Sequence, residues 1–191
     1  MPLLQRESDK KIRCFTAVPV PDGIKEELAR FQKELGPLAP GAKWVKPAGL
    51  HITLKFLGEI SPEKVEEVRA ALRDAVRAAR FNMAFSGLGV FPNPRKARVP
   101  WTGFETGAGE CTGIAAEIED ALEAIGFPRE KRPFRAHLTL ARLKKPSSVG
   151  NDLLDYEFSS SGFSAQSVVL YRSTLKPSGA VYTPIESFPL R

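Results

Sequence analysis

The sequence predicts a mixed α+β fold built on antiparallel sheet. Two observations carry this prediction. Helix-like and strand-like segments interleave along the 191 residues. Several of the strand-like segments are separated only by a short loop, which suits antiparallel pairing because parallel strands need a long crossover. No linker divides the chain clearly, so we expect residues 1–191 to form a single domain.

The expected elements of the first half are strand 11–18, helix 22–35, strand 50–56, helix 61–80 and strand 81–90. Prolines end the first strand because proline cannot donate to a ladder. Apolar residues at helical spacing mark the two helices, with Asp22 and Ser61 as their expected N-caps. Gly58 is expected to close the second strand, and Gly87 and Gly89 to interrupt the third.

The expected elements of the second half are strand 99–104, helix 109–125, strand 137–141, a short helix over 147–156, and strands 168–173 and 180–183. Gly126 follows the apolar stripe of the long helix and is expected to end it. Residues 91–100 carry three prolines and three cations, which predicts a basic loop.

The composition excludes several classes of protein. Hydrophobic residues make up 42% and charged residues 26%, which is typical of a globular chain. No apolar run approaches the ~18 residues of a membrane helix, and the N-terminus lacks the apolar core of a signal peptide. Cys14 and Cys111 are too few for a disulfide scaffold and not spaced as metal ligands. We therefore expect a cytoplasmic protein without metal or membrane contacts, and a monomer. The net charge of +6 suits an anionic partner without requiring one.

The only two histidines occur in the same tetrapeptide pattern, His-Ile-Thr-Leu at 51–54 and His-Leu-Thr-Leu at 137–140. Side chains alternate along a strand, so each histidine shares a face with the threonine two residues on, and the aliphatic residues face the core. The motifs start 86 residues apart, far enough for each to belong to its own sheet. This repetition suggests a duplication, with a cleft at the pseudo-two-fold axis.

Two imidazoles and two hydroxyls around one small anion suit displacement at phosphorus. An imidazole titrates near neutrality, so one copy can take a proton from a nucleophile while the other gives one to a leaving group. Threonine hydroxyls can donate to phosphoryl oxygens as charge develops. A single strand histidine is more often a packing residue, but the matched pair favours a shared site. Two histidines without a carboxylate or cysteine at ligand spacing make a poor zinc set.

The chain resembles the two-histidine (2H) phosphoesterases, and among them the RNA 2′,3′-cyclic phosphodiesterases once described as 2′-5′ RNA ligases. The matching segments are Arg13-Cys14-Phe15, Trp44-Val45, Leu50 to Glu59, Arg98 to Gly103, Phe134 to Arg142 and Phe188-Pro189-Leu190. Ala136 stands where the family often has proline before the second histidine. The resemblance implies a bilobal α+β fold, with two pseudo-two-fold-related antiparallel sheets flanked by helices and a central cleft.

The resemblance also implies metal-independent hydrolysis of a terminal 2′,3′-cyclic phosphate of RNA to a 2′-phosphate. His51 would protonate the departing 3′-oxygen, and His137 would activate water. Thr53 and Thr139 would hold phosphoryl oxygens, and Arg142 would contact phosphate or RNA. From the residues alone, either histidine can be the acid.

Further substrate contacts are expected around the motifs. Lys55 lies four residues after His51 and so shares its face of the strand. It is therefore expected either in the cleft or on its rim. Arg142 lies five residues after His137, so regular alternation would put it on the opposite face of the strand. It reaches the cleft only if the strand bends or ends there. Phe134 is the best candidate to stack on a terminal base, ahead of Trp44 and Trp101. Two basic segments could steer an RNA backbone: Arg95, Lys96 and Arg98, and Arg129, Lys131, Arg132 and Arg135.

Two rival functions remain open on the sequence alone. A reversible 2′-5′ RNA ligase would use the same site in the opposite direction. A noncatalytic RNA-binding module would use the basic loops, with the histidines only contacting phosphate. The intact pair of histidines with both threonines argues against pure binding, which has no need of two groups that titrate near neutrality.

Overall fold

The computed structural model describes residues 11–177 and 179–191. The α-helices are α1 (Asp22–Leu35), α2 (Pro62–Ala75), α3 (Ala108–Glu123) and α4 (Asn151–Leu154). The strands are β1 (Ile12–Pro19), β2 (Ala42–Trp44), β3 (His51–Ile60), β4 (Phe81–Phe91), β5 (Val99–Thr106), β6 (Leu138–Thr139), β7 (Ala141–Leu143), β8 (Phe163–Ala165), β9 (Ser167–Lys176) and β10 (Gly179–Pro189). The expectation of a chain without a signal peptide concerns residues 1–10, which lie outside the described residues.

The strands form two four-stranded antiparallel sheets with corresponding orders, as the duplication predicted. One sheet runs β10-β9-β1-β3 and the other β8-β4-β5-β6, and β2 and β7 form a separate two-stranded ribbon. Each histidine motif therefore lies at or beside an edge strand, β3 in one sheet and β6 in the other. These two edges are neighbours, since Cα atoms of β3 and β6 approach within 8 Å.

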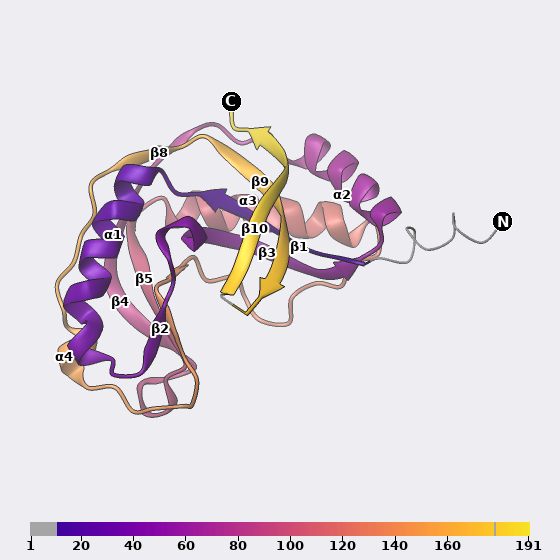
Figure 1. The fold of residues 1–191 in the computed structure, drawn as a ribbon. Coiled ribbons are helices and arrows are strands. Elements are labelled where there is room, and N and C mark those ends of the chain that lie inside the picture. The colour runs from indigo at the N-terminus through magenta and orange to yellow at the C-terminus, as the bar shows by residue number, and fades with distance from the viewer. Residues whose placement is uncertain (1–10, 178) are drawn as a thin grey trace.

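The helices cover the outer faces of the two lobes. In Figure 1, α1 lies on the side of the molecule that holds β4 and β5, while α3 passes behind β9 and β10 and is in contact with α2. Glu186 on β10 pairs with Arg69 and Arg73 at the α2 side, which fixes that helix to the sheet. The outcome is the predicted bilobal α+β arrangement, with two antiparallel sheets and flanking helices.

Most expected elements form, but several boundaries differ. Helix α1 has the expected bounds, yet Pro21 occupies its N-cap and Asp22 lies in the first turn. Ser61 caps α2 as expected, accepting a hydrogen bond from the Lys64 amide at 3.2 Å. That helix ends at residue 75 rather than 80. The short strands β2 and β8 were not expected, because three-residue strands carry no clear sequence period.

Glycine does not end or break strands here as expected. Gly58 has φ +72° and Gly87 has φ +67°, and each lies within a strand that continues past it. Both strands instead carry register shifts next to these glycines. Such bulges accept a left-handed residue without ending the ladder, so the sequence signal was real but its interpretation as a strand end was wrong.

The aliphatic residues of both motifs lie in the hydrophobic core, as their alternation predicted. Ile52, Leu138 and Leu140 are fully buried and Leu54 is 5% exposed, all within one cluster. Full burial of such a side chain is worth about 1.5–3 kcal/mol. These four residues therefore anchor the two histidine strands from behind and leave their other face open.

Lys55 does not face the cleft or its rim, contrary to expectation. The register of β3 against β1 shifts between the partners of Thr16 and Ala17, so that Leu54 is an extra residue and Lys55 turns to the helix side. Its ammonium group is buried and donates to Glu119 Oε1 at 2.8 Å and to the Pro128 carbonyl at 3.1 Å. Glu119 also accepts from the Glu130 amide at 2.7 Å. The pair thus ties the His51 strand to α3 and to the loop that leads to His137.

We expect Lys55→Met to lower the free energy of unfolding by about 3 kcal/mol, because it leaves the partly buried Glu119 carboxylate without its cation. Urea denaturation measures this loss. The matched double variant Lys55→Met/Glu119→Gln removes the charge as well and should recover part of the stability. A Lys55→Met protein as stable as the wild type would show that the pair contributes nothing.

Candidate active site

The His51 imidazole is held at the start of β3 by its backbone and by aromatic rings. Nδ1 lies 2.8 Å from the Gly49 carbonyl oxygen. A carbonyl only accepts, so Nδ1 carries a proton and Nε2 is left with the free lone pair in the neutral ring. Phe15 lies 4.8 Å from the imidazole centroid, and Tyr182 meets it edge-on at 4.9 Å and 84°. These contacts fix both the tautomer and the ring plane.

The His137 imidazole has a matching environment. Its Nδ1 lies 2.7 Å from the carbonyl of Arg135, again two residues earlier in the chain. Phe91 meets the ring edge-on at 5.0 Å and 89°, and the Trp101 ring lies at 6.2 Å. Both lobes therefore present an imidazole with the same nitrogen engaged and the same nitrogen available. The repeated geometry is more informative than the repeated sequence, because it shows that Nε2 is the nitrogen available for reaction in both rings.

Thr53 and Thr139 lie on the partly exposed face with their histidines, as the alternation predicted. From each histidine onward, exposure follows one pattern, with positions one and three partly exposed, two and four buried, a fifth buried, and a sixth exposed. The two buried residues in succession shift the alternation by one. As a result, the sixth positions, Phe56 and Arg142, are exposed.

Arg142 reaches the site because the strand changes partner at Leu140. Before this residue β6 pairs with β5, and after it β7 pairs with β2. The Leu140 carbonyl accepts from the Val45 amide at 2.9 Å and from Gln32 Nε2 at 2.9 Å. The buried Gln32 side chain thus stabilises the break between β6 and β7. Without this break, Arg142 would lie on the face opposite to His137. The positive charge of Arg142 contributes to the lowered pKa of both imidazoles.

Both histidines are neutral in the free protein at neutral pH. The pKa of His51 is lowered to about 4, mainly by burial, with the Arg142 guanidinium adding to the effect and the Gly49 hydrogen bond opposing it. Burial also lowers the pKa of His137, with Arg135 and Arg142 adding to the effect. A bound anion would oppose the arginine charge and raise both pKa values. The site is therefore electrostatically suited to gain a proton together with an anionic ligand.

The remaining expected contacts are distributed unevenly. Phe134 is partly buried and packs against the core, so its role in base stacking stays a prediction. Trp101 is buried beneath Arg135, whose guanidinium carbon lies 4.5 Å from the ring centroid. Arg129 pairs with Asp120 and Glu123 and ties the loop to α3 rather than facing a ligand. Trp44 is partly buried in β2.

Several residues that shape the site were not anticipated. Tyr171, Tyr182 and Phe91 surround the imidazoles, and Gln32 and Glu119 position the strands. Tyr182 and Phe91 come from segments far from either motif. A sequence signal for them existed only in the strand alternation of their own segments, which does not say what lies opposite.

Within residues 11–177 and 179–191, no three His, Cys, Asp or Glu side chains come together as a metal site would require. Burial raises the pKa of Cys14 to about 11 and that of Cys111 to about 12. Both thiols are thus protonated and buried, as expected of packing residues. In this same part of the chain, no helix combines the length and apolarity needed to cross a membrane.

Two imidazoles with Nε2 left unengaged, two hydroxyls and a guanidinium are the groups with which a phosphoesterase can work by proton transfer. The comparison with known families agrees with that class. Residues 18–101 and 105–182 match the family described as LigT like Phosphoesterase, and the chain belongs to this family.

Relatives and solved structures extend the match over nearly the whole chain. A protein of Archaeoglobus fulgidus named RNA 2′,3′-cyclic phosphodiesterase is 38% identical over 180 residues, covering 93% of this chain and 99% of its own. A crystal structure of a Thermus thermophilus protein superposes with a TM-score of 0.78 at 32% identity, covering 94% of this chain and 98% of that one. Escherichia coli LigT complexed with 3′-AMP shares the fold, with a TM-score of 0.79 at 23% identity and coverage of 95% and 99%.

The lowered pKa of His51 predicts acid sensitivity of the fold. The unfolded imidazole, near pKa 6.5, takes up a proton before the folded one, so this contribution is present above pH 6.5 and is lost toward pH 4. Between pH 7 and pH 5 the wild type should lose about 2 kcal/mol of unfolding free energy through this group. His51→Gln should show a fall smaller by that amount in urea titrations at the two pH values. Equal falls in both proteins would contradict the assignment.

Proposed function

We propose that this protein is an RNA 2′,3′-cyclic phosphodiesterase that hydrolyses the terminal cyclic phosphate to a 2′-phosphate. The observation that carries the proposal is the pair of imidazoles on adjacent sheet edges, each with Nδ1 on a carbonyl and both under the influence of Arg142. The relatives are named RNA 2′,3′-cyclic phosphodiesterases, which supports hydrolysis of a cyclic phosphate of RNA.

The reaction needs two proton transfers and no covalent intermediate. A water oxygen attacks phosphorus in line with the bond to O3′ and loses its proton to Nε2 of the base imidazole. The P–O3′ bond breaks, and the departing oxygen takes a proton from Nε2 of the other imidazole. The product is a 2′-phosphate and a free 3′-hydroxyl. The two imidazoles end with their protonation states exchanged, and solvent restores them.

We assign His51 as the acid and His137 as the base, following the positions of the family motifs. The negative phosphodiester favours protonation of His51 by opposing both its burial and the charge of Arg142. Thr53, Thr139 and Arg142 then donate to the non-bridging oxygens, whose charge grows toward the transition state. Arg142 has two roles in this scheme, since it lowers both imidazole pKa values in the free protein and binds the anion that reverses this effect.

A monomeric protein of the cytoplasm, folded as a single bilobal domain, belongs to the same proposal. The two described cysteines, Cys14 and Cys111, are free thiols, which suits a reducing compartment. Size-exclusion chromatography with light scattering measures the oligomeric state directly.

The central test uses an oligonucleotide that ends in a 2′,3′-cyclic phosphate, with EDTA present. We expect conversion to a 2′-phosphate, and His51→Gln and His137→Gln should each lower turnover about 10²–10⁴-fold because each removes one proton transfer. RNA binding should change only a few-fold, and circular dichroism controls for folding.

Each other outcome of this test contradicts a stated part of the proposal. Near-normal turnover in either histidine variant would refute the paired mechanism. A 3′-phosphate product would reverse the leaving group, and EDTA inhibition that a divalent ion relieves would favour metal catalysis. Joining of added RNA with a 5′-hydroxyl would favour ligation, whereas binding without turnover would leave the noncatalytic module.

The role of Arg142 predicts a displaced pH profile. Since kcat/KM reports the free enzyme and both imidazole pKa values lie below 6.5, its bell should have its optimum below pH 6.5. Arg142→Gln should shift this optimum to higher pH and lower kcat/KM about 10²-fold. Arg142→Lys keeps the charge and should retain the wild-type optimum. An optimum that is the same in all three proteins would contradict the electrostatic coupling.

A further inference from the structure

Positive charge is concentrated in the parts of the chain that build the site. Residues 35–58, 75–104 and 131–151 contain fourteen Lys and Arg and no Asp or Glu. The rest of the chain has fourteen basic residues against all twenty-two acidic ones. The first and third stretches contain the two histidine motifs, and the second contains the segment that leads into β5. Charge is therefore segregated along the sequence, although two of the fourteen cations, Lys55 and Arg77, point away from the site.

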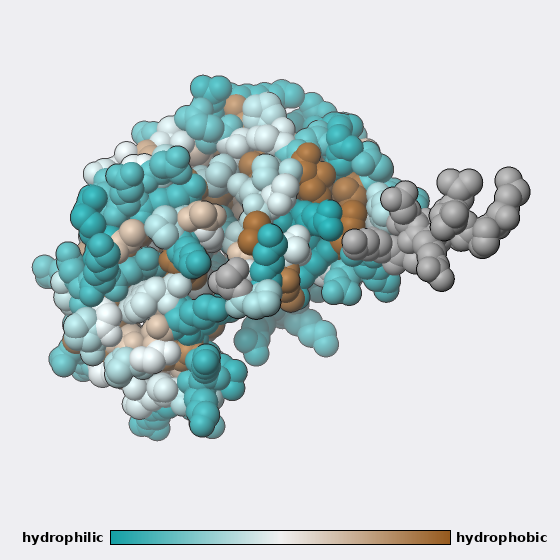
Figure 2. Space-filling model, in the orientation of Figure 1, coloured by the Kyte–Doolittle hydropathy of each residue, from teal (hydrophilic) through white to brown (hydrophobic). Residues whose placement is uncertain are grey.

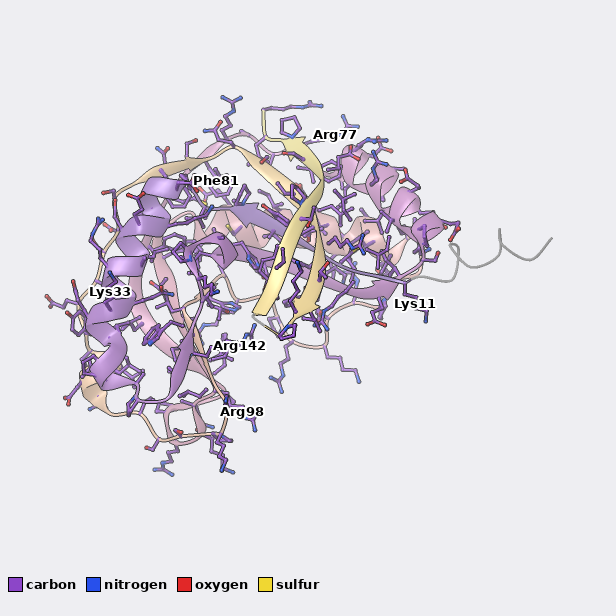
Figure 3. All side chains as sticks on the ribbon, viewed as in Figure 1. Lys11, Lys33, Arg77, Phe81, Arg98 and Arg142 are labelled. Carbon is purple, nitrogen blue, oxygen red and sulfur yellow. The ribbon has the colours of Figure 1, made fainter. Side chains whose placement is uncertain are left out.

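Three cations of these stretches lie on adjacent backbone segments, and we call them the cationic ridge: Lys43, Arg98 and Arg142. Lys43 on β2 is the direct cross-strand partner of Arg142 on β7. On the other side of β7, the Leu143 amide donates to the Arg98 carbonyl at 2.8 Å. All three side chains are exposed. Figure 3 shows Arg98 and Arg142 on the side of this lobe that faces the β9–β10 hairpin.

The ridge is left without neutralising partners in the described part of the chain. Some cations elsewhere are paired with acids, as Arg69 and Arg73 are with Glu186, but none of the three ridge residues takes part in an ion pair there. Like charges directly opposite on a β-ribbon destabilise it. Placing Lys43 opposite Arg142 gives no stability to a surface that only contacts water. A polyanion bound along the ridge would be attracted by both charges and would offset their mutual repulsion.

The ridge continues from the reacting site toward the surface. Arg142 is the ridge residue that closely follows a histidine motif, and its charge contributes to the lowered pKa of both imidazoles. Lys43 and Arg98 lie on the two backbone segments that flank β7. In Figure 2 the outline of the molecule is indented between this lobe and the β9–β10 hairpin, so an extended chain has access to the ridge.

We propose that the ridge binds the RNA strand on the 5′ side of the terminal cyclic phosphate, so that the substrate is a polynucleotide end and not a free cyclic nucleotide. This inference rests on the proposed function. Arg142 contacts the reacting phosphate, and Lys43 and Arg98 contact the phosphates that precede it. Phosphate contacts carry no sequence information, so the ridge confers a preference for length without a preference for bases.

The experiment compares two substrates in two matched double variants of the full chain. The substrates are a mononucleotide 2′,3′-cyclic phosphate and a trinucleotide with the same terminal nucleotide. Lys43→Met/Arg98→Met removes two ridge charges. The control Lys33→Met/Arg77→Met removes two exposed charges on the outer side of the molecule, away from the ridge (Figure 3).

We expect wild-type kcat/KM to be about tenfold or more higher for the trinucleotide at low salt. The ridge variant should lose about tenfold on the trinucleotide and remain within about twofold on the mononucleotide, and the control should match the wild type on both. The slope of log kcat/KM against log salt for the trinucleotide should become shallower by about 1.4, since each phosphate contact on a single strand contributes about 0.7.

Three results would overturn the proposal: no length preference in the wild type, equal losses on both substrates, or the same loss in the control variant. If the wild type hydrolyses neither substrate, the proposed function fails and the ridge is tested separately. In that case, fluorescence anisotropy with a labelled single-stranded hexanucleotide ending in hydroxyls measures binding alone. Weaker binding by the ridge variant than by the control would support the ridge, and equal binding would refute it.

Discussion

The site depends on a constraint of extended backbone, the strict alternation of side chains, and on its interruption at the same place in two strands. Up to the fourth residue of each motif, alternation puts the imidazole and the hydroxyl on one face and two aliphatic residues in the core. The fourth and fifth residues are both buried, so the alternation of buried and exposed side chains shifts by one residue. Without that shift Arg142 would point away from the histidines. The proposed catalytic set thus results from alternation kept for four residues and then broken once.

The part of the site that follows from local geometry was predictable. The faces of both histidines and threonines, the burial of their neighbours and the meeting of two sheets all follow from the repeated tetrapeptide and a period of two. What was missed depends on pairing with distant strands. Lys55 shares the parity of His51, but the bulge against β1 turns it to Glu119. No feature of residues 50–60 alone indicates that bulge. The same limit applies to Gly58. As a glycine it predicted the end of the strand, but its left-handed backbone lies next to a bulge within a longer strand.

The electrostatic character of the site also exceeds what residue types can show. Imidazoles near an unperturbed pKa of 6.5 suggest one charged and one neutral ring at neutral pH. Burial and Arg142 instead lower the pKa of both, so the free protein holds two neutral rings beside uncompensated cations. Desolvation is the largest cause, and it follows from the aromatic residues that enclose each ring. In the proposed mechanism, an anion that binds the site therefore also raises both pKa values toward the protonation state that proton transfer requires.

The two lobes are similar but not identical. They differ at the sixth position counted from each histidine, where the side chain becomes exposed. One lobe presents Arg142 at that position, and the other presents Phe56, 56% exposed and with its ring 6.0 Å from Phe15. A symmetric anion between two identical lobes would bind equally well in either orientation. Only one lobe therefore brings a cation to this position, which makes the two sides of the site unequal for an anion. In the proposed mechanism this inequality favours one orientation of the phosphodiester, so that one imidazole can serve as acid and the other as base although their local geometries are nearly the same.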